Sequence, residues 1–358
     1  MVCWLTALFV LVALPAAAQP QPVAQSSILP TVRIIATGGT IAGVQDAPGT
    51  LGAYRAGTRT VGEIVQSVPE LTKYAQVETE QFSNVASTEI MPSQWVALSK
   101  RINELLQRSD LNGVVVTHGT DRLEETAFFL YLTVKSDKPV VIVGAQRPAT
   151  GISPDGPINL LSAVRTAGSD HARGMGVLVV MDDRIISARE NRKLYPRTGG
   201  FSGGEMGMVG VVAGDGPEFF FRPVRKHGAE TDFDIATIDV LPKVELVYSY
   251  PGGDGPRLGD GTQGLVVTTT GFSPSERDAF TDIRKRGVVI AQVFPSGEHV
   301  LQSSPGAPGL RPAGASGPPI PPTVAVQHLT PQKARIMLML ALTKTKEPRE
   351  VQRFFDEY

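Results

Sequence analysis

Residues 113–126 read Gly113-Val-Val-Val-Thr117-His-Gly-Thr120-Asp-Arg-Leu-Glu124-Glu-Thr126, and this stretch decides the fold. The short apolar run Gly113–Val116 predicts a buried strand, and Glu124–Val134 carries apolar residues at helical spacing. A polar turn separates the two. A buried strand, a turn and a helix in this order form the repeating unit of α/β proteins with a largely parallel sheet.

The same alternation continues on both sides of this stretch. Short apolar runs predict further buried strands at Val32–Ala36, Pro139–Val143 and Gly176–Met181, and Ser93–Gln107 has the apolar spacing of a helix. The glycine-rich stretch Asn191–Gly210 predicts a loop. The sequence therefore predicts one large α/β domain over residues 32–226.

A second α/β series follows a polar connection, residues 227–243. Thr330 is a good N-cap and Pro331 suits the first turn of a closing helix that contains Ile336–Leu342. At 358 residues, two domains are the natural expectation. We predict an α/β fold with a larger N-terminal domain, its mostly parallel sheet flanked by helices, and a smaller Rossmann-like domain over 244–358. The other elements expected in this series are strands Val244–Tyr248, Gly264–Thr268 and Gly287–Val293 and the helix Pro274–Arg286.

The N-terminus predicts a secretory signal. The apolar run Trp4–Leu14 leads into the small residues Ala16-Ala17-Ala18, so we expect a signal peptide over 1–18, a linker over 19–31 and a periplasmic protein. The apolar run is about half the roughly 20 residues of a membrane-spanning helix. The single cysteine, Cys3, lies within the signal, which leaves no cysteine in the expected mature chain for a disulfide or a thiolate.

Composition narrows the class of ligand. Lysine plus arginine (34) nearly balance aspartate plus glutamate (35). A nucleic-acid or anionic-membrane partner would require a positive field, so we expect neither, and a small molecule is the expected ligand. The five histidines are not paired at zinc-like spacing, so we expect no metal, and no phosphate-binding or dinucleotide-binding glycine motif is present.

Two glycine turns carry the candidate chemistry. The first, Ala36–Gly43, follows a predicted strand and places the Thr40 hydroxyl where ligands bind in open α/β sheets. On its own, this turn is better explained by a packing role, because many strand–turn–helix junctions contain Gly-Gly-Thr. In the second, Thr120 and Asp121 precede a helix whose first N–H groups could stabilise an oxyanion. Asp121 could instead cap that helix, and His118 is expected to be structural.

Together, the two turns favour a hydroxyl nucleophile in a shared crevice. A threonine hydroxyl is a weak nucleophile until a neighbouring group takes its proton. Tyr54, Asp121 and Lys193 lie in or near predicted loops and are the candidates for that role.

Several motifs resemble those of bacterial L-asparaginases of the periplasmic kind, within the asparaginase/glutaminase family. Residues 37–43, Thr-Gly-Gly-Thr-Ile-Ala-Gly, resemble the first signature, and Thr117–Asp121 with Glu124–Thr126 resemble the second. The likeness extends over most of residues 32–358. Its other segments are Ser136–Val141, Gly144–Pro148, Asp155–Leu160, Leu178–Asp183, Pro331–Arg335 and Leu340–Thr343.

The resemblance implies a role for each matching residue. Thr40 corresponds to the nucleophile that attacks the side-chain amide carbon of asparagine, and Tyr54 to the tyrosine that helps activate it. Thr120, Asp121 and Lys193 correspond to a second catalytic cluster. Further, Ser87 would bind the substrate α-carboxylate and Asp121 its α-ammonium group, and Thr88 and Thr120 are the other expected substrate-binding positions. The family releases aspartate and ammonia without a cofactor, usually as a homotetramer whose sites are completed by a neighbouring subunit.

The chain departs from the family pattern at the rim of the site. Thr88 stands where well-known members have glutamine or glutamate, and the turn Gly271-Phe272-Ser273 replaces a small polar residue from the partner subunit. Ser303–Pro322 contains no carboxylate to match the partner's acidic residue, for which Glu298 is a substitute candidate. Three functions stay open: an asparaginase, acting through an acyl-enzyme or an attacking water; a glutaminase-asparaginase of mixed specificity; and a non-catalytic periplasmic amino-acid-binding protein.

Overall fold

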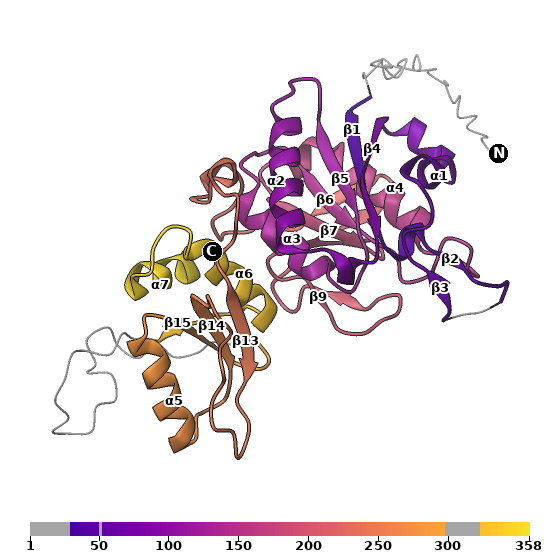
Figure 1. Cartoon of the computed structure of the whole chain (residues 1–358). Helices are drawn as coiled ribbons and strands as arrows, with labels where there is room; N and C mark the ends of the chain where they lie inside the picture. The colour runs from indigo at the N-terminus through magenta and orange to yellow at the C-terminus, as the bar shows by residue number, and fades with distance from the viewer. Residues whose placement is uncertain (1–28, 50–51, 298–322) are drawn as a thin grey trace, which may run out of the picture.

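An eight-stranded sheet forms the centre of the N-terminal part of the chain (Figure 1). The computed structural model describes residues 29–49, 52–297 and 323–358. The expected signal peptide, Glu298 and the Ser303–Pro322 segment lie outside these residues. In spatial order the strands are β12 (Gly216–Phe219), β11 (Met208–Ala213), β8 (Arg184–Ser187), β7 (Val177–Met181), β6 (Val140–Val143), β5 (Gly113–Thr117), β1 (Thr31–Gly38) and β4 (Gln76–Val85).

Five neighbouring strands of this sheet, β7, β6, β5, β1 and β4, run parallel, and the remaining three pair antiparallel. Valine and isoleucine runs such as Val114–Val116 are completely buried. Strands covered on both faces by helices require such continuous apolar runs. This explains why the central strands could be predicted from the sequence.

Helices cover both faces of the sheet (Figure 1). The helices α2 (Pro92–Leu106) and α3 (Leu123–Thr133) contact each other, whereas α1 (Val61–Gln66) and α4 (Gly156–Ala167) both contact the 3₁₀ turn η2 (Pro69–Lys73). The chain moves in the same direction along the sheet from β4 to β5, β6 and β7, yet α4 lies on the face opposite α2 and α3. The β6–α4–β7 crossover therefore has the opposite hand to the crossovers through α2 and α3. Crossovers between parallel strands are right-handed in about 98% of cases, so a left-handed one is unusual.

A four-stranded parallel sheet, in the order β13 (Val244–Tyr248), β14 (Gly264–Thr268), β15 (Val289–Val293) and β16 (Val324–Ala325), forms the C-terminal part. Its helices are α5 (Pro274–Lys285), α6 (Pro331–Ala341) and α7 (Pro348–Glu357). Helix α6 packs against β13 and β14 and also against α3 of the N-terminal part. It therefore joins the two parts through a continuous apolar core. No helix in the described residues is long and apolar enough to cross a membrane.

The shorter elements lie mainly in connections. They include two antiparallel pairs, β2 with β3 and β9 with β10. Their bounds are β2 Val44–Gln45, β3 Tyr54–Arg55, β9 Arg192–Lys193, β10 Phe201–Ser202, and the 3₁₀ turns η1 Thr40–Ala42, η3 Ser87–Glu89, η4 Asp170–Ala172, η5 Gly228–Glu230 and η6 Ile235–Thr237.

The predicted fold class is confirmed, while some element limits differ. The strand expected from Gly176 begins at Val177 and that expected from Gly287 begins at Val289, because both glycines have positive φ angles, 72° and 81°. The closing helix was expected at α6, but α7 follows it. The prediction of a structureless stretch over 191–210 was wrong, since it contains β9, β10 and the start of β11.

Candidate active site

The two glycine turns lie in direct backbone contact at the carboxyl ends of the adjacent strands β1 and β5. A Cβ atom added to Gly39 would lie 2.2 Å from Gly119 Cα, and Gly39 has a φ of 83°. Only glycine permits both this conformation and this approach. The backbone therefore brings the Thr40 turn and the Thr120 turn together.

Thr40 begins η1, directly after this contact. Its side chain is buried, and its Oγ1 lies 2.7 Å from Tyr54 Oη, within hydrogen-bond distance. Tyr54 comes from the β2–β3 hairpin, and its ring lies against Gly43. The backbone N–H groups of Thr58 and Arg59 both donate to Ala42 O at 2.9 Å. The structure thus pairs Thr40 with Tyr54, and backbone hydrogen bonds hold residues 58–59 against η1.

Thr120 and Asp121 meet Lys193 in a second cluster. Lys193 Nζ donates to Thr120 Oγ1 at 2.8 Å and to Asp121 Oδ1 at 2.6 Å. The side chain of Lys193 is 15% exposed and that of Asp121 is 66% exposed, so the carboxylate also faces solvent. The alternative that Asp121 caps the following helix was wrong: Arg122 is the N-cap of α3, and no side chain caps it.

Ser87 lies against the second turn, whereas the Thr88 side chain is exposed. Ser87 Oγ is buried in η3 and accepts a hydrogen bond from Arg122 N at 3.3 Å. A Cβ added to Gly119 would lie 2.9 Å from Ser87 Oγ, which places the hydroxyl against the second turn. Thr88 and Glu89 are exposed. Of the residues expected to bind substrate, Ser87 and Asp121 thus lie at the Thr120 turn, and Thr88 is at the surface.

His118 supports the second turn from inside. It is completely buried, and its Nδ1 lies 2.7 Å from Gly119 O. Burial lowers the pKa of His118 to about 4, so the imidazole is neutral near pH 7 and donates its Nδ1 proton to that carbonyl. A buried neutral donor to the turn backbone is consistent with a structural role.

We expect the free energy of unfolding to decrease as the pH falls from 6.5 towards 4. In this range the unfolded chain binds a proton at His118 that the folded chain does not bind, and the dependence is at most about 1.4 kcal/mol per pH unit. Urea unfolding at pH 7.5, 5.5 and 4.5 measures it. His118→Asn should reduce the slope, while His171→Gln, at an exposed position, should not. Equal slopes for His118→Asn and wild type would contradict this explanation.

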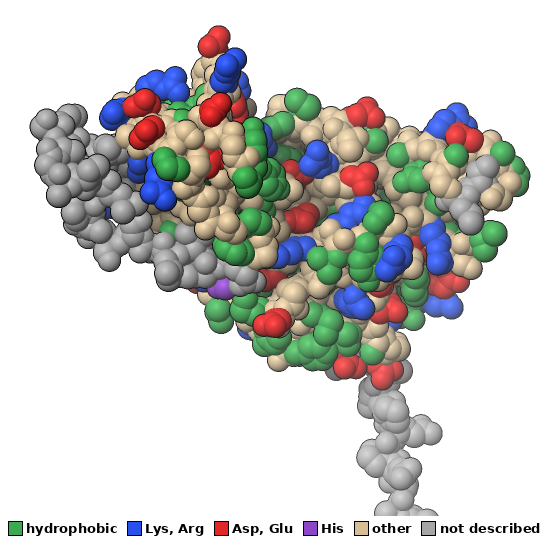
Figure 2. All heavy atoms as spheres, turned by 90° about the horizontal axis from the view of Figure 1, so that it is seen from below, with side chains coloured by type: hydrophobic (Ala, Val, Ile, Leu, Met, Phe, Trp, Pro, Cys, Tyr) green, Lys and Arg blue, Asp and Glu red, His purple; other side chains and the backbone are tan. Residues whose placement is uncertain are grey.

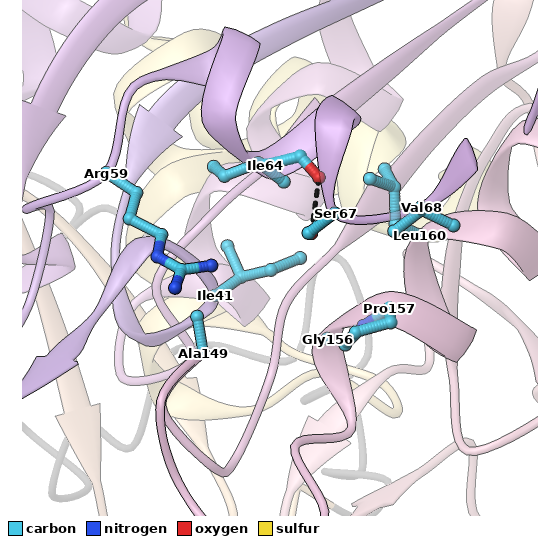
Figure 3. Close-up of a pocket in the computed structure, with 9 residues that line it drawn as sticks. All are labelled: Ile41, Arg59, Ile64, Ser67, Val68, Ala149, Gly156, Pro157 and Leu160. Carbon is cyan, nitrogen blue, oxygen red and sulfur yellow. Dashed lines mark hydrogen bonds between the residues drawn. The ribbon is translucent and has the colours of Figure 1, made fainter.

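A small cavity lies behind the first turn (Figure 3). Its volume is about 40 Å³, and Ile41 of η1 faces it together with Gly156 of α4 and the Arg59 side chain. Typical ligand pockets measure roughly 300 Å³ or more. An amino acid does not fit in this cavity, and Thr40 does not line it, so it is not the substrate site.

Charges of both signs are mixed on the face seen in Figure 2, without a large patch of one sign. This agrees with the balanced composition. Across residues 29–49, 52–297 and 323–358, no group of three or more His, Cys, Asp or Glu side chains is arranged to hold a metal ion.

Three residues near the second cluster were not predicted as part of the site: Glu124, Thr330 and Lys333. Glu124 Oε1 accepts from Thr330 Oγ1 at 2.6 Å, and Glu124 Oε2 accepts from Lys193 N at 3.4 Å. Lys333 is fully buried nearby. The one available signal was a lysine in the first turn of a helix that is apolar from Ile336 onward.

Comparison with known proteins identifies the family. Family models described as "Asparaginase, N-terminal" and "Glutaminase/Asparaginase C-terminal domain" match residues 31–225 and 243–355. The chain is 43% identical to L-asparaginase 2 of Bacillus subtilis, covering 95% of this chain and 91% of the relative. It is 39% identical to the glutaminase-asparaginase of Pseudomonas fluorescens, covering 98% and 97%.

A solved structure shares the fold over nearly the whole chain. The probable cytoplasmic L-asparaginase from Campylobacter jejuni superposes with a TM-score of 0.79 at 34% identity, covering 92% of this chain and 100% of that one. Both family models match, the sequence similarity covers more than nine tenths of the chain, and the fold agrees. These findings are sufficient to assign the family. The chain belongs to the asparaginase family.

Proposed function

We propose that this protein hydrolyses the side-chain amide of L-asparagine to L-aspartate and ammonia, with Thr40 as the nucleophile. The observation that carries the proposal is the contact between the two glycine turns. It brings the Thr40–Tyr54 pair and the Thr120–Lys193–Asp121 cluster to one edge of the sheet. A protein that only binds an amino acid would require neither the Thr40–Tyr54 pair nor the Thr120–Lys193–Asp121 cluster.

In the proposed reaction, Thr40 Oγ1 bonds to the amide carbon as its proton passes to Tyr54 Oη, which lies 2.7 Å away, while Tyr54 gives its own hydroxyl proton to the amide nitrogen. The C–N bond then breaks, and the nitrogen leaves as ammonia with that proton. Water hydrolyses the resulting ester and restores the threonine hydroxyl. Backbone N–H groups of the glycine turns stabilise the oxyanion, at roughly 3 kcal/mol for each well-placed donor.

The second cluster orients the substrate and the groups around it. Lys193 holds the Thr120 hydroxyl and one oxygen of Asp121. The exposed Asp121 carboxylate binds the substrate α-ammonium, the Ser87 hydroxyl binds the α-carboxylate, and Thr88 lies at the rim near the ammonium group. No cofactor takes part in these steps.

We expect L-glutamine to be a second, weaker substrate. Some of the relatives, including that of Pseudomonas fluorescens, are named glutaminase-asparaginase. One methylene group changes discrimination by only about 10- to 200-fold, so a pocket that accepts asparagine does not fully exclude glutamine.

Ammonia release from the two amides, measured side by side over a range of concentrations, tests the proposal. We expect kcat/KM for asparagine to exceed that for glutamine within this range of about 10- to 200-fold. Equal values would favour a mixed enzyme, and a larger value for glutamine would contradict the substrate assignment. Tight calorimetric binding of asparagine without product would identify a binding protein instead.

The proposal includes export and assembly. Residues 1–18 would be removed as a signal peptide, leaving a periplasmic protein with domains over 32–226 and 244–358.

Phe220, Phe221 and Val224 expose between 47% and 96% of their surface, and apolar exposure of this kind is typical of subunit contacts. We propose that these residues form part of a subunit contact, and that the assembly is the homotetramer that the family resemblance implies. N-terminal sequencing of the exported protein and its sedimentation mass test the two statements, and a monomer mass would refute the second.

A further inference from the structure

A buried lysine of the C-terminal part holds the chain that leads to Lys193. Lys333, in the first turn of α6, is completely buried, and its Nζ donates to Arg189 O at 2.7 Å and to Asn191 O. Burial lowers its pKa to about 8, and the nearby charges of Glu124, Glu190, Arg189 and Arg192 also act on it. Burying an ammonium is costly unless it is well bonded. The two carbonyl groups are thus fixed relative to α6.

Glu124 connects the same helix to the backbone of Lys193 itself. One of its oxygens accepts the Thr330 hydroxyl at 2.6 Å and lies 3.9 Å from Lys333 Nζ. The other accepts Lys193 N at 3.4 Å. Glu124 stands in the first turn of α3, four residues after Thr120, so this carboxylate lies between α6 and the second cluster.

The stretch that carries Lys193 has little support of its own. Strands β9 and β10 contain two residues each and pair only with each other. The C-terminal part supplies further contact: Arg192 Nη1 donates to Ser296 O at 2.6 Å. Backbone or side-chain groups at positions 189, 191, 192 and 193 are therefore held by α6, by α3 through Glu124, or by the segment after β15.

We propose that Thr330, Lys333 and Glu124 are positioning residues for Lys193, so that the C-terminal domain of the same chain sets where the Lys193 ammonium meets Thr120 and Asp121. These three residues act through the backbone of residues 189–193 rather than on the substrate. The inference rests on the proposed function for its kinetic consequence. Its structural content, the placement of the Lys193 side chain, can be measured separately.

Thr330→Val is the central test, because valine keeps the shape of threonine but cannot donate to Glu124. It also loses the N-cap bond from Lys333 N, which Glu124→Gln leaves in place, so the two variants are compared. We expect kcat for asparagine to fall about 10- to 100-fold, since a displacement of about 1 Å at a catalytic group has effects of this size. KM should change much less, because the substrate contacts remain. Thr330→Ser should restore most of the rate. Thr345→Val, which removes a partly buried hydroxyl that accepts a hydrogen bond from Glu347 N before α7, is the control and should resemble wild type.

A second readout does not depend on activity. Acetylation of Lys193 by trace acetic anhydride, quantified by peptide mass spectrometry, should be faster in Thr330→Val and Lys333→Met than in wild type, because the amine leaves its two partners. Glu124→Gln serves as the second variant if Lys333→Met does not fold. Wild-type kcat and wild-type labelling in Thr330→Val would overturn the proposal. If the wild-type protein releases no ammonia, the proposed function fails and the labelling alone decides the positioning.

Discussion

Replacing Thr40 with alanine is expected to lower kcat for ammonia release from asparagine by about 10⁴- to 10⁶-fold, the loss typical of removing a catalytic nucleophile. The reason is structural: Thr40 Oγ1 is the hydroxyl that Tyr54 Oη contacts at the end of β1. The side chain is small and the turn is fixed by Gly39, so the fold should be retained. Steady-state kinetics together with a thermal unfolding curve measure both effects.

Thr40→Ser is the control, since it keeps a hydroxyl at the same position and should retain a measurable part of the rate. If purified Thr40→Ala still released ammonia at close to the wild-type rate, Thr40 would not be the nucleophile. A loss of rate that accompanied a loss of folding would instead indicate that the hydroxyl bond to Tyr54 is structural.

Thr120→Val is the second substitution for which we expect a large effect, a decrease in kcat of about 10²- to 10⁴-fold, in the range of lost proton-transfer and positioning groups. Valine fills the same volume but cannot accept the hydrogen bond from Lys193 Nζ. Of the two bonds that this ammonium group donates to the cluster, the one to Asp121 remains. Thr120 is buried and valine keeps its volume, so the fold should be retained. Ammonia release at saturating asparagine measures the result.

Thr237→Val is a matched comparison, because it removes an exposed hydroxyl that bonds only locally, to Asp234 O. It should behave like wild type. A Thr120→Val enzyme with unchanged kcat and raised KM would assign Thr120 to substrate binding alone and would remove it from the proposed catalytic cluster.

The parts of the fold that could be predicted are those whose local pattern has one interpretation. Buried parallel strands such as β5 are continuous apolar runs, and the turns after them are marked by glycine. Strand β4 was not predicted, because its ten residues, Gln76–Val85, lie at a sheet edge and are mostly polar and partly exposed. Edge strands of this kind lack the apolar run on which the predictions depended.

The site could be predicted at its turns but not around them. Thr40 and Thr120 follow predicted strands, so their common location follows from parallel strand order. Glu124 and Thr330 are 206 positions apart in the sequence. Their hydrogen bond depends on how α3 packs against α6, and no local pattern in a single sequence specifies that packing.

The glycine-to-glycine contact also has a consequence for engineering the enzyme. Because Gly39 and Gly119 touch through main-chain atoms, the spacing between the two hydroxyl-bearing turns is set by peptide geometry and cannot be adjusted by exchanging side chains. Libraries intended to alter the accepted amide should therefore leave both turns unchanged. Diversity belongs instead at solvent-facing rim positions such as Thr88 and Glu89, where new side chains alter the entrance without disturbing the backbone beneath it.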